Sequence, residues 1–494
     1  MRITQICPIT LARSEIKKIV LASRLRASAC VLTTAISMVL VTGALFAGSA
    51  TWNLNPTNGF WEIASNWTPA TVPNGPNDTA TFGVSNISDL LFSGYQDEVN
   101  GIVFDAGASP FTITVAPVGI SFNSILTISG VGITNNSGIT QHFVTDVGTE
   151  DLGVIQFTNS STAGDLTVFT NNNSGSTEFF DSSSAGSGTF NNNGGTFFTF
   201  SAGQTDFFDA ATADNATLIA NGSAVSFELG GTILFEGDST GGTARVEVFA
   251  GNPDNPNGNL DISAHNAPGV TVGSIEGSGD VFLGANNLTV GSNNLSTTFS
   301  GVIQDGGSVT KIGIGTLRLS GANTYTGGTL IQRGALLVNN KSGSGTGSGT
   351  VQVNGGTLGG QGKIAGAVTV GTGSGRGAVL APGLAGAGTL AIQSTLTFNP
   401  DAIYRYELNS RTASADKIVA NGVTINGAQF SLTGLGKALM PGEVFTVINN
   451  RAATLIAGTF SNLQDGSIFT VNGYNFLVNY EGGDGNDLTL TVLP

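Results

Sequence analysis

The sequence predicts an all-β protein, a right-handed parallel β-helix (a solenoid) with a cap at each end. Short stretches alternate between apolar and polar residues and are bounded by Gly, Asn and Ser, which is typical of strands joined by tight turns. The 72 glycines among 494 residues disfavour helices. Phenylalanines also recur 23, 28 and 27 positions apart, a spacing within the range of solenoid repeats, at Phe157, Phe180, Phe208 and Phe235.

Residues 1–50 are expected to be a long signal peptide. A basic stretch ends at Arg26, an apolar run follows, and small residues lead to Ala50. The run approaches the roughly 20 residues of a membrane span, so a retained anchor is the alternative. Both cysteines, Cys7 and Cys30, lie in this segment, so we expect neither disulfides nor thiolate sites after it.

Residues 51–83 form a tryptophan-rich segment that we expect to be the N-terminal cap. A β-helix has an open core at each end that must be covered. Trp52, Trp61 and Trp67 supply the apolar bulk for such a cover. The alternative is a glycan-binding module, because tryptophan faces stack well on flat ligands.

Residues 84–298 are expected to form degenerate β-helix coils. The weak repeat of the phenylalanines continues through this region. Two asparagine runs, 171–173 and 191–193, are typical of turns, since Asn tolerates positive φ. If they are stacked in register, their amides are expected to form ladders along the solenoid axis.

Residues 299–340 contain the clearest strand pattern of the chain. Three short strands are predicted at 317–319, 329–331 and 336–338, separated by glycine-rich turns. The stretch resembles the autotransporter-associated β-strand repeat, also called the passenger-associated transport repeat. The resemblance lies in GIGTLRLSGANTYTGGT at 313–329 and GALLV at 334–338. It implies a passenger-like surface protein of bacteria and says little about chemistry.

The remaining residues divide into glycine-rich coils at 341–398 and a C-terminal β cap at 399–494. The Gly/Ser-rich link at 341–349 is expected to protrude from a coil. Residues 399–494 are too few for the roughly twelve strands of a membrane barrel. We therefore expect a passenger-like region without a C-terminal translocator barrel; a separate outer-membrane translocator would then be a partner, along with the export machinery.

Catalytic and metal sites receive little support from the sequence. Asp484 and Asp487, in GGDGND, match part of a calcium-binding nonapeptide, but a single copy supplies few of the 6–8 oxygens that Ca²⁺ takes. No other cofactor is expected. The net charge of −15 argues against nucleic-acid partners. No nucleophile elbow or carboxylate pair stands out, so we expect a non-catalytic protein.

The function predicted from the sequence is that of an exported surface or extracellular protein in adhesion, matrix or envelope structure. Its expected partners are surface glycans or other envelope proteins. The first alternative is a β-helical polysaccharide-degrading enzyme, which a carboxylate cluster in a groove on one flank would support. The second alternative is the glycan-binding module of Trp52, Trp61 and Trp67.

Overall fold

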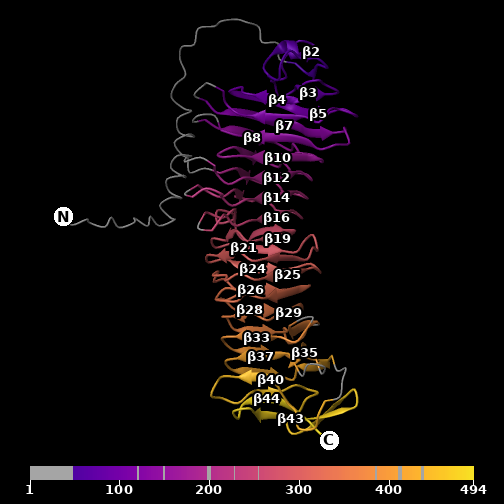
Figure 1. Cartoon of the computed structure of the whole chain (residues 1–494), viewed down its shortest axis with the longest axis vertical. Coiled ribbons are helices and arrows are strands. Elements are labelled where there is room, and N and C mark those ends of the chain that lie inside the picture. Colours follow the sequence, from indigo (N-terminus) through magenta and orange to yellow (C-terminus); the bar gives the residue numbers. More distant parts are fainter. Residues whose placement is uncertain are drawn as a thin grey trace, which may run out of the picture. The chain divides into compact units, whose positions relative to one another are not determined.

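In a computed structural model, the chain is described over residues 48–118, 122–147, 151–196, 202–226, 228–253, 255–375, 377–383, 386–409, 414–434 and 439–494. These residues all belong to one unit, 46–494, in which strands are stacked coil upon coil (Figure 1). The only helical element among them is a 3-10 turn, η2 (Ala64–Asn66). Residues 1–47 of the expected signal peptide lie outside the described part, and Ala50 already belongs to the first strand.

Within the described residues, two sheets begin at the N-terminal end. The first has 12 strands, in the order β2 (Trp67–Thr68), β1 (Ala50–Trp52), β3 (Thr79–Phe82), β5 (Gln96–Phe104), β7 (Ser124–Asn135), β9 (Gly153–Phe157), β11 (Ser176–Phe179), β13 (Gln204–Phe207), β15 (Thr232–Phe235), β17 (Asn259–Asp261), β20 (Asp280–Phe282) and β23 (Val302–Gln304). The second has 16 strands: β4 (Asp89–Phe92), β6 (Thr112–Val115), β8 (Gln141–Thr145), β10 (Thr167–Asn171), β12 (Thr189–Asn192), β14 (Thr217–Ala220), β16 (Arg245–Val248), β19 (Ser274–Gly277), β22 (Thr297–Phe299), β25 (Thr316–Leu319), β27 (Ala335–Val338), β29 (Gly356–Gly360), β32 (Ala378–Pro382), β35 (Ala402–Asn409), β36 (Ser414–Ala415) and β39 (Gln429–Thr433).

Two further sheets occupy the C-terminal coils of the described part. The third has 9 strands: β18 (Gly269–Val272), β21 (Asn287–Val290), β24 (Ser308–Lys311), β26 (Thr329–Ile331), β28 (Val351–Val353), β31 (Val368–Val370), β34 (Leu396–Phe398), β38 (Val423–Asn426) and β41 (Ala457–Thr459). The fourth has 7 strands: β30 (Lys363–Ile364), β33 (Thr389–Ile392), β37 (Lys417–Ala420), β40 (Val444–Asn450), β44 (Asp487–Val492), β43 (Tyr474–Gly482) and β42 (Ile468–Val471).

Neighbouring coils pair in parallel and in register, which confirms the predicted parallel β-helix. Strand β11 pairs with β13 and β13 with β15, so Phe179, Phe207 and Phe235 occupy one column. Antiparallel strand pairs also occur in the described chain, between β1 and β2, between β35 and β36, and among β40, β44, β43 and β42. Figure 1 shows the coils following one another from β3 to β40.

The core is built from inward-facing side chains that stack on their counterparts in the next coil. Phe157, Phe179, Phe207 and Phe235 are fully buried, and the centroids of neighbouring rings in this column are 4.8, 4.9 and 4.8 Å apart. Phe180 and Phe208, which mark the repeat spacing in the sequence, stack on each other on the outside. The inward ring of these two coils is the residue before each of them, because one residue reverses the face in a strand.

The asparagine runs form two ladders of amides, one inside and one outside. Inside, the Asn171 amide nitrogen donates to the Asn192 side-chain oxygen at 2.8 Å, and both residues are buried. Outside, Asn193 donates to Asn172 at 2.8 Å and Asn221 donates to Asn193 at 3.0 Å. The ladders expected from stacking in register are therefore present.

Candidate functional site

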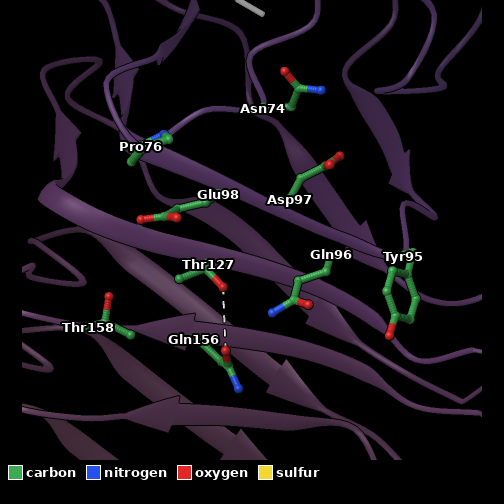
Figure 2. A pocket seen from close by; sticks show the side chains of 9 residues that line it. All are labelled: Asn74, Pro76, Tyr95, Gln96, Asp97, Glu98, Thr127, Gln156 and Thr158. Carbon is green, nitrogen blue, oxygen red and sulfur yellow. Dashed lines mark hydrogen bonds between the residues drawn. The ribbon is translucent and has the colours of Figure 1, made fainter. Parts of the chain in front are cut away.

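A hollow of about 620 Å³ opens on the flank of the first coils, next to the tryptophan-rich segment (Figure 2). Its lining is mostly polar and combines two carboxylates with amides, hydroxyls and one aromatic ring. The lining residues are Asn74, Pro76, Tyr95, Gln96, Asp97, Glu98, Thr127, Gln156 and Thr158. Figure 2 shows Tyr95 near one end and Thr158 near the other, with the two carboxylates between them.

The hollow arises because β5 is longer than β3, its neighbour in the sheet. Within β5, only Gly101–Phe104 pair with β3, and the contact ends with the Asn100 amide, which donates to the Asp78 carbonyl at 2.8 Å. The first residues of β5, 96–99, pair with β7 on their other side. The loop at 74–76 therefore faces a strand edge across open space rather than continuing the sheet.

One column of outward-facing side chains forms the floor of the hollow. Glu98 pairs in register with Thr127, and Thr127 with Gln156. The Thr127 hydroxyl donates to the Gln156 side-chain oxygen at 3.4 Å, and the Gln156 amide donates to Glu178 at 3.0 Å. These bonds fix the orientation of the floor and leave the Glu98 carboxylate at the top of the column.

The two carboxylates of the hollow have no hydrogen-bond or ion-pair partner among the described residues. Burial, assisted by the nearby charge of Glu62, raises the pKa of Asp97 to about 6. The Asn74 side-chain oxygen is also buried without a donor in the described part of the chain. The two carboxylates therefore present acceptor oxygens whose hydrogen-bonding capacity is unused, whereas the Asn74 oxygen is closed off from the hollow.

An exposed aromatic pair stands at the Tyr95 end. Tyr95 is 62% exposed and Phe122 53% exposed, and their ring centroids are 5.1 Å apart with an interplanar angle of 71°. Most aromatic rings of the described chain lie in the core, so this pair is unusual. An exposed aromatic surface beside polar groups is typical of a binding site.

The three tryptophans lie inside the N-terminal segment and not on its surface. Trp52, Trp61 and Trp67 are 2%, 0% and 1% exposed, and Trp67 meets the other two edge to face at 5.0 and 4.9 Å. Their indole nitrogens donate to the carbonyls of Ile87, Pro73 and Trp61. No ring face is free to stack on a sugar, so the alternative of glycan contact through these residues is wrong.

Asp487 of the calcium motif is used within the C-terminal sheet. Its carboxylate accepts from the Asn450 amide at 2.9 Å and from the Asn449 side chain at 3.2 Å, while Asp484 lies on the exposed turn beside it. Across the described residues, no group of three or more Asp, Glu or His side chains is placed to hold a metal ion.

A second hollow, of about 520 Å³, lies over β19, β22 and β25. Its acidic residue, Glu276, is paired with Arg245, which also contacts Glu247 at 3.0 Å. Burial raises the pKa of Glu247, and Arg245 opposes that effect. Because Arg245 already occupies oxygens of both carboxylates, this hollow offers less free hydrogen-bonding capacity than the first.

Tyr95, Asp97 and Glu98 are not predicted as site residues from the sequence. One signal was available, because Gln96, Asp97 and Glu98 are three successive polar residues at the start of a strand that is otherwise alternating. Such a break in alternation indicates residues that are not all part of a half-buried strand pattern, but it does not show that they line a hollow. Phe122 follows from no local pattern, since its exposure depends on how the loop before β7 packs.

Comparison with known proteins gives a match to a family model and similarity to solved structures. The model of the passenger-associated-transport-repeat family matches residues 309–338. Among solved structures, the chain is similar to the Hap adhesin of Haemophilus influenzae, with 12% sequence identity, a TM-score of 0.24, and coverage of 84% of this chain and 59% of that one. No curated protein matches the chain.

The matched repeat is an integral part of the solenoid. Residues 309–338 run from β24 through β25 and β26 to β27, and each of these strands pairs in parallel with strands of other coils. No helix in the described residues is long and apolar enough to cross a membrane. The chain thus contains a match to the passenger-associated-transport-repeat at 309–338, and these residues form coils of a parallel β-helix.

Proposed function

We propose that this protein is exported and acts at the cell surface or outside the cell, in adhesion, matrix or envelope structure. The observation that carries the proposal is the passenger-associated-transport-repeat at 309–338, built into a continuous parallel solenoid. Such a solenoid presents long flanks, which suit contacts repeated along a surface. Its partners would be surface glycans or envelope proteins, with the export machinery and a separate translocator acting during transport; no cofactor is required.

Surface display is tested by adding protease to intact cells that produce the protein. We expect the protein to be degraded on intact cells or recovered from the medium, while a periplasmic marker stays intact. Recovery only from the periplasm or cytoplasm contradicts the proposal. Adhesion is tested by comparing attachment of cells with and without the gene, and equal attachment argues for an envelope or matrix role.

A second candidate function is degradation of a polysaccharide, because Asp97 and Glu98 line one hollow on a flank. The raised pKa of Asp97 is a property of general acids in glycoside hydrolysis. The test is release of reducing ends from soluble polysaccharides by the purified chain, with the variants Asp97→Asn and Glu98→Gln as controls. Activity lost in both variants supports the enzyme, and absence of activity in the unmodified chain rejects it.

A further inference from the structure

We propose that the hollow beside Tyr95 binds an uncharged, hydroxyl-rich glycan, with the Tyr95–Phe122 pair as the stacking surface. This rests on the proposed surface function and names the ligand class of the same hollow. The ligand would lie over the Glu98–Thr127–Gln156 column and place an apolar sugar face against the aromatic pair.

The aromatic pair supplies the first argument. The structure describes four large aromatic side chains as clearly exposed: Phe60, Tyr95, Phe122 and Phe249. Tyr95 and Phe122 are the two most exposed of these, and they touch each other. Rings left in water forgo the free energy of burial, and the C–H faces of sugars cover such rings well. The pair thus provides apolar contact at one end of a polar hollow.

The polar lining supplies the second argument. Asn74, Gln96, Thr127, Gln156 and Thr158 carry amides or hydroxyls, which both donate and accept hydrogen bonds. Sugar hydroxyls also do both, so this set of groups matches a glycan. A lining of acceptors alone would have favoured a basic peptide. The size of the hollow, about 620 Å³, falls within the roughly 300–1,000 Å³ of small-ligand sites.

The charge of the hollow supplies the third argument. Asp97 and Glu98 line it, Glu62 lies close to Asp97, and no lysine, arginine or histidine is among the lining residues. The whole chain adds a net charge of −15. Glycans with carboxylate or sulfate groups are therefore repelled, whereas uncharged glycans use the free carboxylate oxygens as acceptors.

The test is affinity electrophoresis of the purified chain in gels that contain soluble mannan, galactan, xylan or β-1,3-glucan. We expect at least one of these to retard the chain, and Tyr95→Ala to weaken the retardation by about fivefold, which corresponds to the loss of about 1 kcal/mol from one aromatic contact. Phe122→Ala is expected to weaken it in the same direction. Phe249→Ala, which removes an exposed ring elsewhere, is expected to leave it unchanged.

Two further arms separate a glycan from a basic peptide. Glu98→Gln keeps an acceptor oxygen and removes the charge, so we expect its binding of neutral glycans to stay within about threefold of that of the unmodified chain. The unmodified chain is expected to bind neither hyaluronan nor oligo-lysine. Binding of oligo-lysine that Glu98→Gln abolishes overturns the proposal in favour of a cationic peptide. Lack of retardation by all four polysaccharides, or equal loss in Phe249→Ala, also overturns it.

Failure of this inference and failure of the proposed function give different results. A chain that is displayed on cells but is not retarded by any of the polysaccharides keeps the surface function and loses the glycan site. A chain that is retarded but is found only inside cells loses the surface function and keeps the site. Unchanged melting temperatures of Tyr95→Ala and Phe122→Ala show that these exposed positions do not act through folding.

Discussion

The coils of β9–β16 and the coils of the transport repeat solve the same packing problem with different side chains. In the first group, Phe179 pairs with Phe207, 28 residues further on. In the repeat, Leu317 pairs with Leu336, only 19 residues further on. The coils of the first group, whose paired residues are 21, 22 or 28 positions apart, enclose stacked rings and a buried amide ladder, whereas the coils of the repeat are filled mainly by Leu, Ile and Val.

This difference shows that the distance between paired strands, and not the residue type, determines how side chains stack in the core. Parallel strands lie about 4.8 Å apart, and flat rings and amides repeat well at that distance. The Phe179–Phe207 ring spacing of 4.9 Å and the 2.8 Å bond from Asn171 to Asn192 both follow from it. Aliphatic side chains do not require a particular spacing of this kind. In the short coils, it is the turns that require a particular geometry.

The turns of the repeat require glycine at defined positions. Gly313 has φ +64°, and a Cβ there would lie 2.0 Å from the Gly291 carbonyl oxygen of the preceding coil. Gly334, one coil later, has φ +71°, and a Cβ there would lie 2.4 Å from the Gly313 carbonyl oxygen. The glycines of the repeat motif therefore serve the close stacking of successive turns.

The largest effect is expected from breaking the internal ring column. Phe207→Ala removes a fully buried ring between Phe179 and Phe235, and we expect the free energy of unfolding to fall by about 3–4 kcal/mol. Urea unfolding followed by fluorescence measures it. Phe208→Ala, one residue away in the outer pair with Phe180, is the matched control and is expected to cost about 1 kcal/mol. Equal losses of unfolding free energy in the two variants would show that the inner column stabilises the fold no more than the outer pair does.

A smaller effect is expected from the buried amide ladder. The Asn171 side-chain oxygen accepts from Thr145 at 2.7 Å and Thr177 at 2.9 Å, and its amide donates to Asn192. Asn171→Ala leaves these buried groups unpaired, and we expect a loss of about 2 kcal/mol in unfolding free energy. The control is Asn172→Ala in the outer ladder, for which the loss is expected to be about 0.5 kcal/mol because water replaces the partner. A loss for Asn171→Ala no larger than the control contradicts the prediction.

Strands with a strict period of two could be predicted from the sequence almost to the residue. The three strands predicted in the repeat correspond to β25, β26 and β27. The spacing of the phenylalanines predicts the length of the coils, but it does not say which ring of a doublet faces the core. In the doublets Phe179–Phe180 and Phe207–Phe208 either ring satisfies the pattern, and only the pairing of β11 with β13 decides between them.

The loops and the binding hollow could not be predicted in the same way. The link at 341–349 was expected to protrude, yet residues 344–347 are buried and Asn323 forms a bridge with Ser344. Small side chains without a pattern allow either outcome, so the neighbouring coil decides. The hollow beside Tyr95 likewise depends on β5 extending past β3, a register fact that no local pattern contains.

The smallest effect concerns Lys311, a charge inside the repeat. It lies in the inward column of β24, is 1% exposed, and donates to the carbonyls of Ile312, Gly313 and Arg333. Burial lowers the pKa of Lys311 to about 8, whereas the unfolded chain retains the ordinary value of 10.5. Between pH 8 and 10.5 the unfolded chain therefore binds more protons than the folded chain, so the stability of the folded state rises with pH in this window and is flat below it. The carbonyls stabilise the charged form of Lys311, so we expect the free energy of unfolding to rise by only about 1 kcal/mol from pH 7 to pH 10.

Urea unfolding at both pH values should show this rise relative to Lys311→Met. The exposed Lys363→Met is the control and should keep the slope of the unmodified chain. If the unfolding free energy of Lys311→Met rises with pH as steeply as that of the unmodified chain, another group titrates in this window. Lys311 would then be buried in the repeat without a change in its pKa.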